Sequence, residues 1–134
     1  MEWCQAVLGS MTERRDGLIV NVASSAAQWT VSAASAYIAS KAAVIAMTRV
    51  LSAELKGSGV RVFSFGPWSA RTGMAEALTT SSAFTARQRE RFVVSDDAVA
   101  ARQLEGTIRM LRQMIAGDLD QYLGGFLDSE APPA

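Results

Sequence analysis

The spacing of apolar residues changes along the chain and predicts helices and strands in turn. Residues 2–14 carry apolar side chains at helical spacing, and Asp16-Gly17 ends that predicted helix. The short branched run LIVNV (18–22) then predicts a strand buried on both faces, as in a parallel sheet. VRVFSF (60–65) predicts a second strand, and YLGGFL (122–127) predicts a third.

Two longer helices are predicted between these strands. Segment 35–56 is apolar almost all round its helix, which indicates packing on two sides, such as against a sheet and a partner subunit. Gly57-Ser58-Gly59 ends that helix. Ser95 is predicted to cap the second long helix and Gly117 to end it. The predicted core stripe of this helix consists of Leu104, Ile108, Leu111 and Ile115.

This order of elements predicts an α/β fold with a three-stranded parallel sheet and flanking helices. The chain has 134 residues, enough for one domain, which we place at residues 1–127. Residues 128–134 are predicted to form a flexible tail. Residues 66–74 predict a loop, and residues 75–92 predict short helices with poorly defined ends.

Composition narrows the function classes. The 13 basic and 13 acidic residues cancel, so no overall field favours nucleic acid or an anionic membrane. The absence of histidine removes histidine-based metal sites and Ser-His-Asp hydrolysis, and we predict no metal. Residues 17–40 carry no charge but are too polar to span a membrane, and the N-terminus is not typical of a signal peptide. With Cys4 as its single cysteine, the chain is predicted to be cytoplasmic.

The segment SSAAQWTVSAASAYIASK (24–41) carries candidate chemistry. Residues four apart share one face of a helix, so Tyr37 and Lys41 are predicted to project together. A fixed ammonium stabilises a neighbouring phenolate, which makes a tyrosine usable as an acid or base. A serine hydroxyl at the end of the preceding strand, such as Ser24, can hold a substrate oxygen beside the phenol. Taken alone, Tyr-x-x-x-Lys is a weak signal, because a helical tyrosine more often simply packs.

The combination of these motifs is more specific. GLIVNVASS, then SAYIASKAA, then VRVFSFGPWSARTGM resembles the short-chain dehydrogenase/reductase family. The resemblance implies a Rossmann-type fold, of which this chain would hold the last three strands. It also implies an NAD(P)-dependent oxidoreductase that interconverts an alcohol with a ketone or aldehyde.

The family's functional residues can be carried over by position. Ser24 lies 13 residues before Tyr37 and matches the substrate-orienting serine, with Ser25 as the alternative. Tyr37 matches the catalytic acid/base, and Lys41 matches the lysine that binds the nicotinamide ribose and activates the tyrosine. Cofactor contacts at the carboxamide end are also predicted, at Ala70 and Thr72. For Thr72, capping of a helix is an equally plausible reading.

Part of the family pattern is absent. No glycine-rich turn for the pyrophosphate is found, so the sequence does not distinguish NAD from NADP. The family's fourth catalytic residue, an asparagine, would precede Met1, and Asn21 lies inside a strand and is not its equivalent. Trp68 stands where the family has a loop glycine, with a glycine displaced to Gly66, and could block the nicotinamide position.

Two further readings remain beside the enzyme. The chain could be a truncated, non-catalytic relative that acts as an interaction module, or an incomplete gene product. Whether the chain is an enzyme or an interaction module, we expect it to form a homo-oligomer or to pair with a full-length homologue. In the family, the helix that carries the tyrosine commonly packs in a subunit interface. The first strand would have one bare edge, and such an edge recruits other chains.

Overall fold

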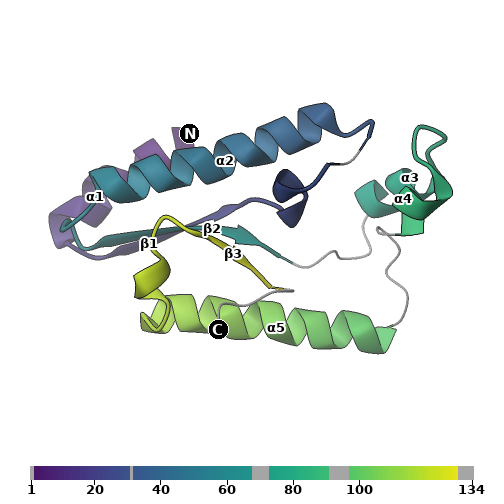
Figure 1. Cartoon of the computed structure of the whole chain (residues 1–134). Helices are drawn as coiled ribbons and strands as arrows, with labels where there is room; N and C mark the ends of the chain where they lie inside the picture. Colours follow the sequence, from purple (N-terminus) through teal and green to yellow (C-terminus); the bar gives the residue numbers. More distant parts are fainter. Residues whose placement is uncertain (1, 31, 68–72, 91–96, 130–134) are drawn as a thin grey trace.

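The protein folds into three layers, with a sheet between helices on both faces (Figure 1). The computed structural model describes residues 2–30, 32–67, 73–90 and 97–129. The elements are α1 (Glu2–Arg14), β1 (Gly17–Val22), the 3₁₀ helix η1 (Ser25–Gln28), α2 (Ser35–Glu54), β2 (Val60–Gly66), α3 (Gly73–Thr80), α4 (Ala86–Glu90), α5 (Asp97–Ala116), the 3₁₀ helix η2 (Asp120–Tyr122) and β3 (Phe126–Asp128).

The sheet has three parallel strands in the order β1-β2-β3. Gly17 pairs with Val60, and Ser64 pairs with Phe126. The predicted fold class, an α/β arrangement around a three-stranded parallel sheet, is confirmed. Since the strands are parallel, their carboxyl ends meet at one edge of the sheet, and they point toward the side on which α3 and α4 lie (Figure 1). In α/β sheets ligands bind outside this edge.

Side chains of successive residues in β1 project to opposite faces of the sheet, as in any pleated strand. On one face α1 and α2 cover a buried cluster of Ile19, Leu51, Val60 and Val62. On the other face α5 covers a cluster of Phe63, Phe65, Met110, Met114, Leu119 and Leu127. Leu18 and Val20 pack against this second cluster. The central strand is therefore buried on both faces, with Val62 and Phe63 both 0% exposed.

The predicted core stripe of α5 was wrong at three of its four positions, whereas the fourth, Leu111, packs against the buried cluster between α5 and the sheet. Met110 and Met114 are the buried residues of that helix, whereas Leu104, Ile108 and Ile115 are 55%, 41% and 66% exposed. The helical spacing identified an apolar stripe but did not determine which direction the stripe faces. The structure turns the methionines toward the sheet instead.

The exposed stripe of α5 points away from β3. A Cβ added at Gly106 would lie 3.6 Å from the Ser129 carbonyl oxygen, so that flank of α5 faces the end of β3. At 3.6 residues per turn, Met110 and Met114 lie between Gly106 and the stripe around the helix. The stripe therefore faces the β1 side of the sheet. On that side β1, within the described residues, pairs with β2 alone.

The third strand also differs from its prediction. It spans Phe126–Asp128 rather than 122–127, and Tyr122 lies in η2. Gly124 has a φ of 76°, which an extended strand does not allow, and its amide donates to the Val62 carbonyl oxygen at 2.9 Å. Gly124 and Gly125, whose amide donates to the Tyr122 carbonyl oxygen at 2.8 Å, thus form the turn that leads into β3.

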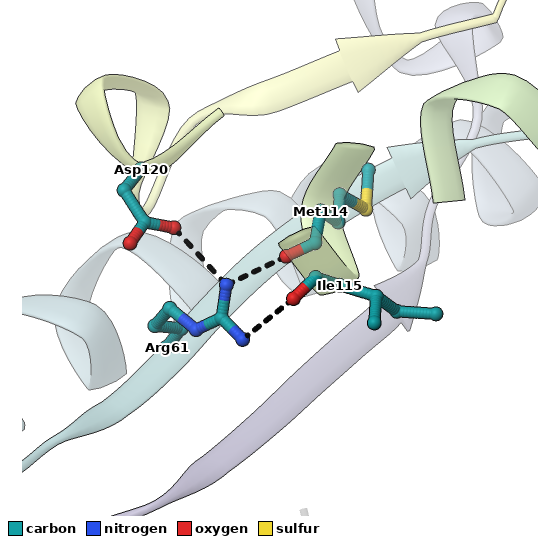
Figure 2. Close-up of polar contacts among 4 residues, drawn as sticks. All are labelled: Arg61, Met114, Ile115 and Asp120. Atoms are coloured by element: carbon teal, nitrogen blue, oxygen red, sulfur yellow. Dashed lines mark hydrogen bonds and ion pairs between the residues drawn. The ribbon is translucent and has the colours of Figure 1, made fainter. Parts of the chain in front are cut away.

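Arg61 of β2 ties the sheet to the end of α5 (Figure 2). Its Nη1 donates to the Met114 carbonyl oxygen at 2.7 Å, and its Nη2 donates to the Ile115 carbonyl oxygen at 3.2 Å. The same Nη1 lies 3.3 Å from Asp120 Oδ1. The last carbonyls of a helix lack intrahelical partners and carry partial negative charge, so a guanidinium caps them well. This contact fixes α5 across the face of β2.

Candidate active site

Lys41 and Tyr37 lie together beside the carboxyl end of β1. Lys41 Nζ donates to the carbonyl oxygen of Val22, the last residue of β1, at 3.1 Å. The same ammonium lies 5.9 Å from the centroid of the Tyr37 ring. This distance permits a cation–π interaction. The predicted projection of the two side chains into one region is thus found in the structure, while their chemical roles stay predictions.

The helix that carries both residues begins without a side-chain cap. Its N-cap is Ala34, and the amide of Ile38 donates to the Ala34 carbonyl oxygen at 2.9 Å. Ala33, just before it, has a φ of 61°, an uncommon conformation for a residue with a Cβ. This strained turn delivers the chain into the first turn of α2, where Tyr37 is 38% exposed. Nothing in the sequence marks Ala33 for such a conformation.

Ser24 lies two residues beyond the Val22 carbonyl. It is the N-cap of η1, and its Oγ accepts a hydrogen bond from the Ala26 amide at 3.2 Å. That bond uses one lone pair of the hydroxyl and leaves its proton available to a further acceptor. Among the described residues, no hydrogen bond joins Ser24 to Tyr37. Ser25, the alternative, is the first residue of η1.

A polar chain that the sequence did not predict links three elements behind this site. Asn21 Nδ2 donates to Thr48 Oγ1 at 2.9 Å, and the Cys4 thiol donates to Asn21 Oδ1 at 3.5 Å. Thr48 is 0% exposed, in the middle of α2. The only available signal was one polar residue inside the apolar run LIVNV. Its partner could not be inferred without the packing of α2 on β1.

A family model described as short chain dehydrogenase matches residues 1–83, which include β1, η1, α2 and β2. The chain belongs to the short-chain dehydrogenase family. The predicted resemblance is confirmed, and the pair formed by Tyr37 and Lys41 lies inside the matched segment.

Curated relatives and a solved structure agree with this assignment. The D-threitol dehydrogenase of Mycolicibacterium smegmatis is 47% identical over 64 residues, which cover 48% of this chain and 25% of the relative. A short chain dehydrogenase of Pseudocercospora fijiensis is 38% identical over 81 residues, covering 58% of this chain and 26% of the relative. A variant of actinorhodin polyketide ketoreductase, solved with NADPH, is 27% identical with a TM-score of 0.66.

The chain spans only part of these short-chain dehydrogenases. The structural match covers 90% of this chain but only 48% of the polyketide ketoreductase chain. This likeness agrees with the predicted partial Rossmann-type fold. Ala70 and Thr72, the predicted cofactor contacts, and Trp68 lie outside the described residues.

Gly66, the glycine displaced from the family's loop, has a packing role at the end of β2. A Cβ added there would lie 2.7 Å from Phe126 Cζ and 3.4 Å from the Ser25 backbone nitrogen. A glycine allows the β3 side chain and the turn after β1 to approach the β2 backbone closely. Gly66 thus brings the Ser24–Ser25 turn against the sheet edge where Tyr37 and Lys41 lie.

Proposed function

We propose that this chain carries the proton-transfer centre of a cytoplasmic, NAD(P)-dependent oxidoreductase that interconverts an alcohol with a ketone or aldehyde. The observation that carries the proposal is the position of Lys41, whose ammonium donates to the Val22 carbonyl oxygen at 3.1 Å and lies 5.9 Å from the centroid of the Tyr37 ring. A phenol beside a fixed ammonium, at the ligand-binding edge of a parallel sheet, suits proton exchange with a substrate oxygen.

Each residue has a distinct part in the proposed reaction. In the direction of reduction Tyr37 gives its phenolic proton to the carbonyl oxygen as that oxygen becomes an alcohol. Lys41 stabilises the phenolate that is left, and Ser24 donates its hydroxyl proton to hold the substrate oxygen. When bound, the nicotinamide cofactor supplies the hydride for the carbonyl carbon, which none of these side chains can supply.

The donor set at Lys41 fits a nicotinamide ribose. An ammonium has three N–H donors, and the structure gives one of them to the Val22 carbonyl oxygen. Two donors are left for the ribose hydroxyls, with Tyr37 adjacent. The NADPH of the solved ketoreductase supports a nicotinamide cofactor here, either NAD or NADP. Ala70 and Thr72 complete the proposed cofactor contacts.

We expect the chain to bind NADH or NADPH, and the Lys41→Met variant to bind about tenfold or more weakly. The variant keeps the aliphatic stem but removes the charged donors, each worth about 1.5–3 kcal/mol when bonded. Isothermal titration calorimetry with both cofactors measures the effect. Lys56, the only other lysine, is exposed, so Lys56→Met is the matched control and should bind like the wild type.

Two outcomes would count against this function. Absence of binding to the wild-type chain by either cofactor would rule out a cofactor site in these residues. Equal losses in Lys41→Met and Lys56→Met would indicate a general charge effect instead of a ribose contact. Turnover is then measured with a panel of alcohols and ketones that includes threitol, since a 47% identical relative is named for that polyol.

We also propose that α2 contacts a second copy of this chain or a full-length homologue. Thr48 and Leu51 are its buried residues, and its outward face is uncharged along a stripe with helix-contact spacing. The stripe consists of Ala39, Ala43, Ala46, Val50 and Ala53. By length and composition alone Ser35–Glu54 could also cross a membrane, with 11% of its most apolar window buried. Soluble core helices pass that test as well, and a helix partner fits small residues at this spacing.

Association should therefore depend on the outward face of α2. Val50 is 57% exposed and has the largest side chain of the stripe, so Val50→Glu places a charge in the proposed contact and should shift the chain toward monomer. Sedimentation velocity over a concentration series measures this shift. Ile115→Glu, at a 66% exposed position on α5, is the control and should leave the association unchanged. A wild-type chain that stays monomeric throughout would refute contact with a second copy of this chain.

A further inference from the structure

Asn21 is a half-buried polar residue on the helix-covered face of β1. It lies in β1 on the side covered by α1 and α2, whose core contains Ile19 and Leu51. A leucine or valine would satisfy that apolar environment without needing a partner. An amide there requires hydrogen bonds, because a buried polar group without them is costly. Thr48 provides one at 2.9 Å and is itself fully buried.

The amide of Asn21 is held in one orientation. Cys4 Sγ donates to Asn21 Oδ1 at 3.5 Å, and Nδ2 donates to Thr48 Oγ1. A thiol donates weakly, and in this orientation the oxygen end of the amide faces α1 while the NH₂ end faces α2. Thus α1, β1 and α2 meet at one residue.

This polar chain lies next to the contact of Lys41 with the strand. Asn21 immediately precedes Val22, whose carbonyl accepts from Lys41 Nζ at 3.1 Å. Thr48 follows Lys41 by seven residues, which is two helical turns, so both project from nearly the same side of α2. Adjacent residues of β1 therefore bind two points on one face of α2. Two such points fix both the rotation of the helix and its position along the strand.

We propose that Asn21 and Thr48 form a positioning pair that holds Lys41, and with it Tyr37, at the end of β1. Packing of apolar residues alone tolerates small rotations and shifts of a helix, whereas a buried hydrogen bond has a narrow range of length and angle. When the pair is lost, α2 remains packed but Lys41 loses its fixed distance to Val22. Any effect of this loss on proton transfer rests on the proposed function, whereas the loss of the fixed distance between Lys41 and Val22 does not.

The chain has two lysines, which makes a direct test possible. With ¹⁵N-labelled lysine, the ammonium groups of Lys41 and Lys56 give separate NMR signals, assigned with Lys56→Met. In the wild type the hydrogen-bonded Lys41 ammonium should exchange with water about tenfold more slowly than the exposed Lys56 ammonium. Thr48→Val removes the hydroxyl and keeps the shape of the side chain. In this variant the Lys41 exchange rate should rise to that of Lys56.

Three further variants separate positioning from general loss of stability. Thr48→Ser keeps the hydroxyl and should restore slow exchange at Lys41. Leu51→Ala removes buried volume from the same face of α2 and should leave the Lys41 signal unchanged while lowering stability. Asn21→Val suits a buried strand, so it provides a second route to breaking the pair if Thr48→Val does not fold. Circular dichroism checks folding in each case.

The outcomes distinguish this inference from the proposed function. An unchanged, slowly exchanging Lys41 signal in a folded Thr48→Val or Asn21→Val variant would overturn the positioning pair, even if cofactor binding is intact. Loss of the signal in Leu51→Ala to the same extent would also overturn it. In contrast, a wild type with a protected Lys41 but no binding to NADH or NADPH would refute the proposed function and leave the positioning pair supported.

Discussion

Gly59→Ala is expected to destabilise the chain by about 3–5 kcal/mol, a large share of the typical stability of a small domain. Gly59 has a φ of 86°, which costs a residue with a Cβ about 1–2 kcal/mol. A Cβ at this position would also lie 2.1 Å from the Arg15 carbonyl oxygen. That atom is backbone and cannot rotate away. The turn between α1 and β1 would have to separate from the turn between α2 and β2.

Gly57→Ala is a matched control two residues earlier. Gly57 has a φ of 80°, nearly the same as Gly59, but an added Cβ there would meet nothing within 4 Å. Both substitutions restrict the unfolded chain equally, so this effect cancels between them. Gly57→Ala should therefore lose only the conformational part, about 1–2 kcal/mol.

Urea unfolding followed by circular dichroism measures both variants. We expect the Gly59→Ala midpoint to lie well below that of Gly57→Ala, with both below the wild type. Equal midpoints would mean that the two turns at the amino ends of the strands can move apart at no cost. In that case the hydrogen bond from Arg15 Nη2 to the Gly57 carbonyl, at 3.0 Å, would also contribute little.

These glycines illustrate what sequence could and could not predict. Gly57-Ser58-Gly59 was predicted to end a helix, and α2 indeed ends at Glu54 with positive φ at both glycines. A helix stop depends on local backbone preferences, which sequence carries directly. The contact of Gly59 with Arg15 joins residues 44 apart in sequence and exists only once the strands have paired in register. No local pattern contains that information.

The same distinction applies to the direction of α5 and to the candidate site. Helical spacing placed Tyr37 and Lys41 on one face because the rule needs only the helix itself. It could not predict that Lys41 contacts the Val22 carbonyl or that Asn21 binds Thr48, because both depend on how α2 crosses β1. On α5, two apolar sets share the helix, and only the tertiary packing selected the methionines.

Tyr37→Phe should lower kcat by about 10²–10⁴-fold, the range that a positioned proton donor contributes. The substitution removes one hydroxyl and keeps the ring over which the Lys41 ammonium lies at 5.9 Å. Cofactor affinity should therefore change little, in contrast to Lys41→Met, which loses affinity and rate together. The rate of NAD(P)H consumption with the best substrate of the panel, and calorimetry with the cofactor, measure the two quantities.

The control for this variant is Tyr122→Phe. Tyr122 is the only other tyrosine, lies in η2 and packs against the cluster under α5, on the opposite face of the sheet from α2. It should retain the wild-type rate. A Tyr37→Phe variant with more than a tenth of that rate would assign the proton transfer to another group. A matching fall in Tyr122→Phe would attribute the loss to stability, because Tyr122 packs against the core cluster on the opposite face of the sheet from α2. Only a selective loss of kcat at Tyr37 would support proton transfer beside Lys41 as the chemistry of this chain.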